Sequence, residues 1–252
     1  MAFRLPTLLG IALFLFLTQS LLAETFAIHT TVHSRGESEP TAEHVTIFTE
    51  GQILDFLLTS PERVTQFDSA SRQFTLAMPG QKKKTNLSAD ELIQFAATEQ
   101  GRAEASSSAL IRFAAKPTFR EQFDRDAGTL SLTSPHWDYL VHASRDASPE
   151  VLSRYGEFAN WYTNLNALFR PIPPAVRLEL NRVLDRHGCL PTQVRVRIKR
   201  DGDVLLEQES RHELILHLTQ REEQLLASWK EAAPTCESVP LPQFLSLVNL
   251  RP

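Results

Sequence analysis

The sequence predicts an α+β fold in which a curved antiparallel β-meander, shaped like half a barrel, packs against amphipathic helices. Two observations predict this class. The first half of the chain alternates apolar and polar residues over short segments that end at turn-forming residues, as expected of an antiparallel sheet with one buried face. The second half places apolar residues three or four positions apart, which is the period of a helix with one buried face.

Five short segments of the first half are expected to form consecutive strands. Turn-forming residues such as Gly51 and Pro61 separate them. Strands joined by such short turns pair antiparallel with their neighbours, so together they form a meander. The expected strands are residues 26–32, 45–49, 52–58, 62–68 and 72–78.

A hairpin pattern occurs twice in this region at a constant offset of 56 positions. Residues 66–68 (Gln-Phe-Asp) precede an apolar strand that begins at Phe74, and residues 122–124 repeat these letters before a strand that begins at Leu130. The aspartate suits the turn because its carboxylate can accept hydrogen bonds from backbone N–H groups further along the chain. We therefore expect two similar hairpins in one sheet.

The remaining elements are marked by capping and turn residues. Two capping boxes, Ser88 with Glu91 and Thr219 with Glu222, mark the starts of helices. An Asp-Gly pair at 201–202 marks a hairpin. These signals and the apolar spacing predict helices after residue 88, at 152–169, at 174–188 and after residue 219, strands at 136–142, 193–199, 204–208 and 212–218, and a final strand or clip at 239–248.

Residues 1–23 are expected to be an export signal that is cleaved after Ala23. Arg4 supplies the positive start, residues 5–17 form an apolar run, and residues 20–23 form the exit. The run is shorter than the roughly 20 residues of a membrane-spanning helix, and no later run approaches that length. We expect an exported protein, periplasmic or secreted, with one α+β domain over residues 24–252. Residues 24–145 are mainly meander, and residues 146–252 supply helices, a hairpin and a C-terminal helix.

Charge and glycine content argue against two classes of function. The chain has 26 basic and 30 acidic residues, so no general attraction to the nucleic-acid backbone is expected. Its nine glycines form neither a P-loop nor a G-x-G-x-x-G pattern, so we predict no nucleotide cofactor, and indeed no cofactor of any kind.

The two cysteines, Cys189 and Cys236, are a disulfide candidate, because an even pair of cysteines in an exported protein commonly forms a bridge. The alternative is two buried free thiols. Spacing alone leaves both open, because the sequence does not give the separation of the two Cα atoms.

No catalytic or metal-binding residue is predicted. His29 and His33 lie four apart on an expected strand, where they are about 13 Å apart and cannot share an ion. His212 and His217 resemble the H-E-x-x-H zinc motif with one residue too many. His187 beside Cys189 offers only two ligands. Among nucleophile motifs, the G-x-S-x-G, S-x-x-K and C-x-x-C patterns are all missing from the sequence.

Two basic runs have simple structural interpretations. Arg195, Arg197 and Lys199 alternate along one strand and are expected to form the solvated face of a sheet. The three lysines at 82–84 follow Pro79 and Gly80 and are expected at a solvated hairpin tip.

The pattern of strands resembles the half-barrel fold of periplasmic lipoprotein carriers, the LolA/LolB-like group. The strand ladder of residues 26–78, the hairpin of residues 123–132 and the strand of residues 137–141 carry the resemblance. It covers residues 25–145, and the hairpin at 193–208 would continue it. In that group a curved sheet and helices enclose an apolar cavity that receives acyl chains. No ligand-binding residue can be transferred by position, and the helix at 152–169 differs from the small carriers.

Three functions therefore stay open. The first is a non-enzymatic exported protein that binds a lipid or other apolar molecule on the concave face of its sheet. The second is a structural or interaction module of the cell envelope with a filled core, whose protein partner the sequence does not name. The third is a hydrolase whose catalytic residues are dispersed along the chain.

Overall fold

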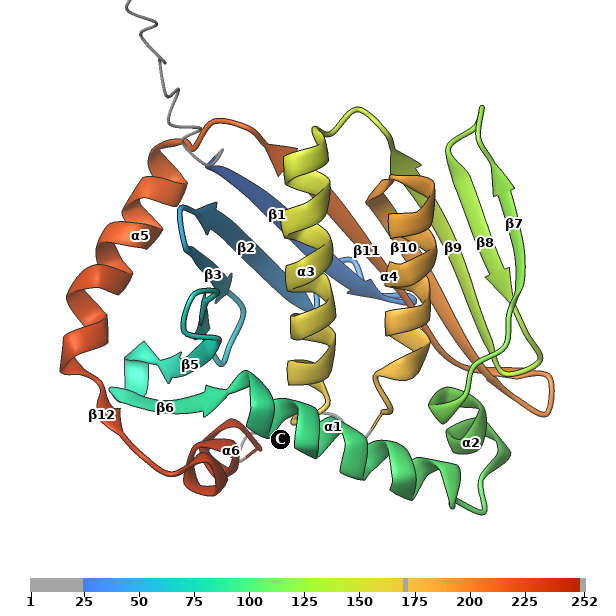
Figure 1. Cartoon of the computed structure of the whole chain (residues 1–252), viewed down its shortest axis with the longest axis horizontal. Helices are drawn as coiled ribbons and strands as arrows, with labels where there is room; N and C mark the ends of the chain where they lie inside the picture. Colours follow the sequence, from blue (N-terminus) through green and yellow to red (C-terminus); the bar gives the residue numbers. More distant parts are fainter. Residues whose placement is uncertain (1–24, 170–171, 250–252) are drawn as a thin grey trace, which may run out of the picture.

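The computed structural model describes residues 25–169 and 172–249. Within them, twelve strands form one open sheet in the order β12-β6-β5-β4-β3-β2-β1-β11-β10-β9-β8-β7, accompanied by six α-helices (Figure 1). The predicted α+β class with a curved sheet is confirmed. The expected export signal lies outside the described residues.

The first meander matches the predicted ladder of strands. Each strand pairs antiparallel with the next, and the meander continues one strand beyond the prediction. Of the three lysines predicted at a solvated hairpin tip, Lys82 lies exposed in the turn, directly after a short 3-10 turn, η1 (Pro79–Gln81), whereas Lys83 and Lys84 begin this extra strand. Lys83 pairs with Glu237, and Nζ of Lys84 donates a 2.9 Å hydrogen bond to the carbonyl oxygen of Ala233. The strands are β1 (Phe26–Ser34), β2 (Ala42–Thr49), β3 (Gln52–Leu57), β4 (Arg63–Asp68), β5 (Gln73–Met78) and β6 (Lys83–Ser88).

Two helices lead from β6 to a second meander at the other end of the sheet. Helix α1 (Ala89–Glu104) begins with the predicted capping box of Ser88 and Glu91, and α2 (Ala109–Ala115) follows. Figure 1 shows α1 running beneath α3 and α4, from the end of β6 to α2. The second meander consists of β7 (Arg120–Asp124), β8 (Thr129–Thr133) and β9 (Trp137–Ser144).

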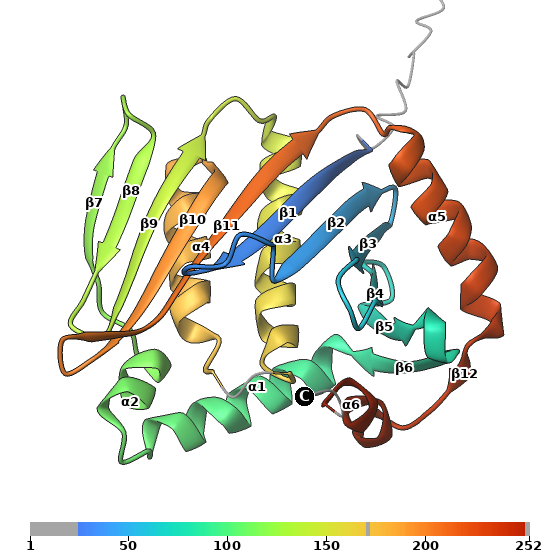
Figure 2. The ribbon, with the colours of Figure 1, turned by 180° about the vertical axis from the view of Figure 1, so that it is seen from behind.

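The two meanders are joined by a long hairpin from late in the chain. Strands β10 (Leu190–Arg200) and β11 (Asp203–Ile215) turn at the predicted Asp-Gly pair. Strand β10 pairs with β9, and β11 pairs with β1, so the hairpin fills the centre of the sheet. Figure 2 shows β11 beside β1 and β10 beside β9 from the reverse side. The first strand and a late strand therefore lie together in the middle of the molecule.

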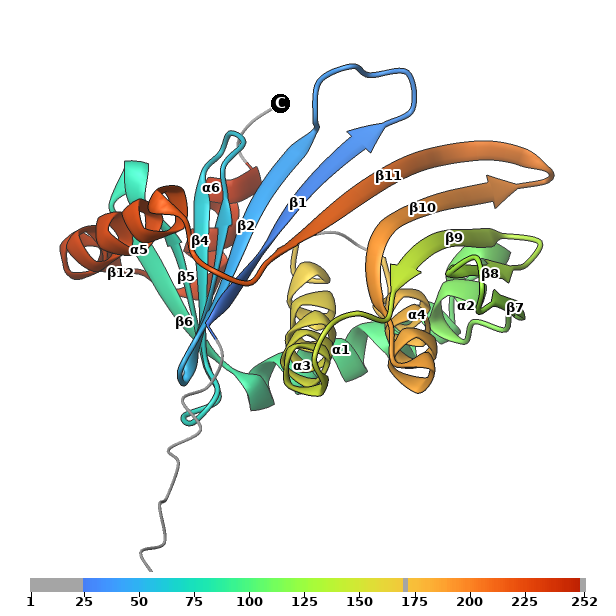
Figure 3. The ribbon, with the colours of Figure 1, turned by 90° about the horizontal axis from the view of Figure 1, so that it is seen from above.

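The helices cover the sheet unequally. Helices α3 (Pro149–Asn166) and α4 (Ala175–His187) lie side by side within the bend of the sheet, whereas α5 (Gln220–Ala232) lies on its outer side (Figure 3). Aromatic rings fill the concave side of the first meander, where Phe26 stacks on Phe48 at 4.2 Å between ring centroids, and Phe158 of α3 packs edge-on against Phe48.

Three apolar clusters make up the core. The first lies on the concave side of β1–β6 beneath α3 and includes Phe67 and Phe74. The second lies beneath α2 and α4 against β8–β10 and includes Leu130 and Val141. The third lies on the convex side beneath α5 and includes Trp229. Each Å² of apolar surface buried in these clusters contributes about 25 cal/mol to stability, and this burial holds the helices on the sheet.

The C-terminal segment differs from the prediction. Residues 239–248 were expected as a final strand or clip, but the chain forms a short 3-10 turn, η2 (Ala233–Thr235), a two-residue strand, β12 (Glu237–Ser238), and then α6 (Leu241–Asn249). The reason lies in the spacing of Leu241, Phe244 and Leu247, which are three apart and share one helix face against the first cluster. Strand β12 pairs parallel with β6, so the sheet is mixed at this edge.

The two cysteines do not form the candidate disulfide. Cys189 and Cys236 are buried free thiols. Cys189 follows the end of α4 and packs in the second cluster, whereas Cys236 directly precedes β12 at the far edge of the sheet. Because each thiol is packed at a different end of the fold, the alternative of two free thiols is the one the structure supports.

Candidate ligand-binding site

A band of polar side chains crosses the concave face between the first and second apolar clusters. Its position follows from strand alternation: Thr30 lies two residues beyond Ile28, which packs in the first cluster, so both side chains point toward the helices. The strand register places Thr30 between His44 of β2 and His212 of β11. The central polar band, as we name it, consists of Thr30, His44, Thr46, Asp55, Ser210 and His212.

Asp55 is the buried charge at one end of this band. Its carboxylate lies 3.0 Å from Nδ1 of His44 and accepts hydrogen bonds from the hydroxyl groups of Thr46 at 2.7 Å and Tyr162 at 2.9 Å. Burial alone would raise the pKa of Asp55, but attraction to His44 and these three hydrogen bonds lower it below its ordinary value. Asp55 is therefore a buried, ionised carboxylate whose charge is stabilised by His44, Thr46 and Tyr162.

Tyr162 connects this buried carboxylate to helix α3. Burial raises the pKa of Tyr162, and the adjacent charge of Asp55 raises it further, so the hydroxyl group keeps its proton and serves as a donor. Tyr162 also interacts with Arg63, whose guanidinium lies 4.1 Å from the ring centroid of Phe169. At the other end of α3, Nη2 of Arg154 donates to the carbonyl oxygen of Thr49 at 2.6 Å. Polar contacts thus hold both ends of α3 to the sheet.

His212 lies at the other end of the band. Its Nδ1 is 3.0 Å from the hydroxyl of Thr30, and its Nε2 is 2.9 Å from the hydroxyl of Ser210. Burial, reinforced by the positive charge of Arg177 and the proximity of His44, lowers the pKa of His212 to about 3. The imidazole is therefore neutral near pH 7, with one ring nitrogen donating and the other accepting.

Arg177 reaches this region from helix α4. Its Nε donates a 3.1 Å hydrogen bond to Oδ1 of Asn181, and its positive charge acts on Tyr155 of α3. Its charge acts on three titrating groups from three elements: Tyr139 of β9, Tyr155 of α3 and His212 of β11. The guanidinium therefore lies between the helix pair and the sheet, next to the central polar band.

A groove between α3 and α4 leads toward the same groups. The groove is narrow, with an interior volume of about 30 Å³, and it opens to solvent. Tyr155 and Asn181, the two side chains that interact with Arg177, line it. Its other lining residues are mostly small or apolar: Leu152, Gly156, Ala159, Leu184, Asp185, Gly188 and Cys189.

Packing on the concave face is uneven. Beneath α3, the rings of the first cluster are almost fully buried. Along β1, β10 and β11, several of the side chains that point to the concave side keep part of their surface accessible, although helices lie opposite them. These half-buried residues are Thr30, Val32, Val196, Leu206, Ser210, His212 and Leu214. They combine apolar and hydrogen-bonding groups.

The polar band does not have the arrangement of a hydrolytic triad. The hydroxyl of Ser210 contacts His212, but the other nitrogen of His212 contacts the Thr30 hydroxyl, where a triad has a carboxylate. Asp55, the buried carboxylate, orients His44 instead. A histidine with a pKa of about 3 is also a poor proton acceptor. The arrangement suits binding and orientation better than acid–base chemistry.

Three of the histidines considered for metal binding, His29, His187 and His212, have other partners. Nε2 of His29 lies 2.8 Å from Oε1 of Glu222 on the convex side, and the ring of His187 stacks on Phe123. Throughout residues 25–169 and 172–249, no three metal-binding side chains of His, Cys, Asp or Glu come together.

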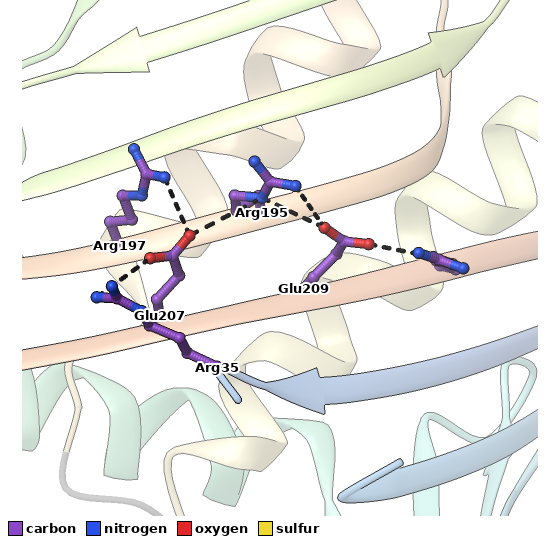
Figure 4. Close-up of polar contacts among 6 residues, drawn as sticks. Arg35, Arg195, Arg197, Glu207 and Glu209 are labelled. Atoms are coloured by element: carbon purple, nitrogen blue, oxygen red, sulfur yellow. Dashed lines mark hydrogen bonds and ion pairs between the residues drawn. The ribbon is translucent and has the colours of Figure 1, made fainter. Parts of the chain in front are cut away.

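The stripe of Arg195, Arg197 and Lys199 lies on the convex face, on the solvated side as expected. Figure 4 shows Glu207 and Glu209 between the arginines of β10, β11 and the end of β1. Arg195 contacts Glu209 at 2.8 Å, and Arg197 contacts Glu207 at 3.0 Å. Exposed pairs of this kind contribute about 0 to 1 kcal/mol each to folding stability. These charged side chains therefore keep this face of the sheet in contact with water and add little to its stability.

Sequence patterns did not identify Asp55, Tyr162 or Arg177. Asp55 had the clearest signal, because it is the charged residue on a strand face otherwise formed by Ile53 and Leu57. Tyr162 and Arg177 gave none, since a tyrosine in an apolar stripe and an arginine on an amphipathic helix are both common in ordinary helices.

No helix in the described part of the chain is both long enough and apolar enough to cross a membrane. No protein-family model and no curated protein sequence matches this chain.

Proposed function

We propose that this chain is an exported, non-enzymatic protein that binds an amphipathic molecule with an acyl chain, between the concave face of its sheet and helices α3 and α4. The observation that carries the proposal is the half-buried surface along β1, β10 and β11, which mixes apolar and hydrogen-bonding side chains and lies between two apolar clusters. Ligand pockets typically combine a mainly apolar lining with a few well-placed polar groups.

The groove between α3 and α4 supports the proposal as a route of entry. It is mainly apolar near Leu152, Ala159 and Leu184, and polar where Tyr155 and Asn181 line it. An acyl chain placed there would gain about 25 cal/mol for each Å² of apolar surface removed from water. The resemblance to LolA/LolB-like carriers is consistent with such a ligand and stays a prediction.

Mass spectrometry under native conditions tests the proposal. The protein, produced with its export signal and purified without detergent, should carry a lipid whose mass is lost on denaturation. The delipidated protein should then bind a fluorescent fatty-acid analogue with saturation at one molecule per chain.

Two variants of α3 localise the binding. In Ala159→Trp a large ring fills the groove, and the bound fluorescence should fall at least tenfold. Ser153→Trp places the same ring on the exposed side of α3 and should bind like the wild type. Equal binding by both variants, or a bare mass together with no fluorescent binding, would contradict the proposed function.

A second candidate is an interaction module of the cell envelope. The convex face of β9–β11 favours it, because α5 covers only the other half of that face and the ladder of Arg195, Arg197, Glu207 and Glu209 stays partly exposed. A photo-crosslinking amino acid at position 197 should then capture one defined protein in living cells, whereas the same group at exposed position 182 on α4 should not. Absence of a band specific to position 197 would remove this candidate.

A further inference from the structure

Arg177 is a cation inside the protein without an anionic partner. Among the described residues, its guanidinium hydrogen-bonds to the side chain of Asn181 and interacts with Tyr155, and it forms no ion pair with a carboxylate. Other interior charges are compensated, as the contact between Asp55 and His44 shows. A half-buried arginine normally pairs with a carboxylate or phosphate, because removing its charge from water costs free energy that a partner must offset.

The position of Arg177 on its helix increases the local positive potential. It lies in the first turn of α4, where the backbone N–H groups that have no partner within the helix already give the helix end a partial positive charge. The N-cap residue, Pro174, makes no side-chain capping bond, and the first turn contains no acidic residue. Acidic residues are favoured at this end of a helix, so a basic residue here is the reverse of the usual preference.

The groups that face Arg177 from the other elements are neutral near pH 7. Burial raises the pKa of Tyr139 to about 12 and also raises the pKa of Tyr155. Burial holds the pKa of His212 at about 3. Each of these groups can donate or share a hydrogen bond, yet none supplies negative charge. The surroundings of Arg177 are therefore polar and positive, and two of its neighbours, Tyr155 and Asn181, line the groove between α3 and α4.

We propose that Arg177 binds the anionic head group of a single-chain amphiphile, a carboxylate or a phosphate, while the acyl chain lies between the concave face of the sheet and helices α3 and α4. The planar guanidinium can form two parallel hydrogen bonds with either group, and Tyr155 and Asn181 orient it. This inference rests on the proposed function, whose ligand class it narrows from any acyl molecule to an anionic one.

Three ligands with the same twelve-carbon chain distinguish binding of the charged head group from binding of the acyl chain. They are dodecanoate, dodecyl phosphate and dodecan-1-ol. Each is titrated below its aggregation concentration into the delipidated full-length mature protein, and the displacement of a fluorescent fatty-acid analogue is measured. The wild type should bind one or both anions at least tenfold more tightly than the alcohol, because charge-assisted hydrogen bonds are about twice as strong as neutral ones. The ratio between the two anions identifies the head group.

Substitution of Arg177 then assigns the preference. Arg177→Met should bind the alcohol like the wild type but lose the tenfold preference for anions, and Arg177→Lys should keep part of it because the charge stays and the planar fork is lost. Arg182→Met, on the exposed side of the same helix, should keep the full preference. Circular dichroism and the thermal midpoint establish that each variant is folded before it is titrated.

The outcomes distinguish this inference from the proposed function. Equal affinity of the wild type for all three ligands overturns the role of Arg177 and leaves acyl binding intact. An anion preference that persists in Arg177→Met also overturns that role. If none of the ligands displaces the probe, and the probe itself does not bind, the proposed function fails and this inference fails with it.

Discussion

The hydroxyl group of Tyr162 lies 2.9 Å from Oδ2 of Asp55, joining helix α3 to strand β3 across 107 positions of the chain. The same carboxylate contacts His44 and Thr46 within the sheet. One buried charge therefore fixes the position of a helix that borders the groove and the polar band. Because this contact joins α3 to the sheet, weakening it should make it easier for α3 to move away from the sheet.

Tyr162→Phe should lower the free energy of unfolding by about 1.5 to 3 kcal/mol, the range for a hydrogen bond to a charged group. The ring keeps its packing against Phe158, so the loss reports mainly the hydroxyl. Urea denaturation of the wild type, Tyr162→Phe, Asp55→Asn and the double variant measures the coupling. The two substitutions should be non-additive by at least about 0.5 kcal/mol, and strict additivity would show that the contact contributes nothing.

His212 should make stability depend on pH between about 6.5 and 3. Its pKa is about 3 in the folded protein and ordinarily 6.5, so the unfolded chain takes up a proton first as the pH falls. The contribution of His212 to the free energy of unfolding is fully present above pH 6.5 and is lost progressively as the pH falls from 6.5 to 3. Between pH 7 and pH 5 the loss from this group should be about 1 to 2 kcal/mol, because one pKa unit corresponds to about 1.4 kcal/mol.

His212→Gln should remove this dependence, since glutamine keeps hydrogen-bonding capacity but does not titrate. His142→Gln, on the exposed convex side of β9, is the matched control and should keep the wild-type profile. The charged and titrating neighbours, Arg177 and His44, are the same in both variants. A wild-type profile in His212→Gln would mean that other groups cause the acid sensitivity. Asp55 adds a separate loss only below pH 3.8, because its pKa is lowered.

Gly128→Ala should be considerably more destabilising than Gly51→Ala. Both glycines have a positive φ, +60° and +75°, where a side chain is strained. A Cβ atom at Gly128 would lie 2.7 Å from the carbonyl oxygen of Ala143, whereas nothing lies within 4 Å of one at Gly51. The clash should add about 1 to 3 kcal/mol to the conformational cost. Thermal or urea unfolding of the two variants measures the difference, and equal losses would place the effect in backbone conformation alone.

Both cysteines should be found reduced in the purified protein. Cys189 and Cys236 are buried, and burial raises the pKa of the Cys189 thiol, so little thiolate is available to react. A thiol reagent should modify neither cysteine in the native protein and both after unfolding in denaturant without reductant. An intact mass two hydrogen atoms below that of the reduced chain would instead show a disulfide.

The hairpin prediction was accurate because the turn chemistry is local. Phe67 faces Phe74 in the first copy, and Phe123 faces Leu130 in the second, so the register is the same 56 positions apart. The carboxylate of Asp68 accepts a bond from the N–H of Ser71, and that of Asp124 accepts one from Ala127. Alternation and a short turn determine such a unit without help from the rest of the chain.

The candidate site was not predictable because its members come from distant segments. Arg177 approaches His212 only after α4 has packed beneath the sheet and β11 has paired with β1. The separation of Cys189 and Cys236 likewise depends on the order of strands across the sheet, which their spacing in the chain does not reveal. The final segment was misassigned because a short apolar run fits a strand and a helix equally well.

The pairing of β1 with β11 has a consequence for how the molecule is made. The Thr30–His212 contact spans 182 positions, so the amino-terminal strand has no partner on that side until nearly the whole polypeptide has emerged. Closing such a distant connection is entropically slow. The newly synthesised chain must therefore keep an open strand edge for most of its synthesis, and that edge is available for pairing with other chains until β11 has been made.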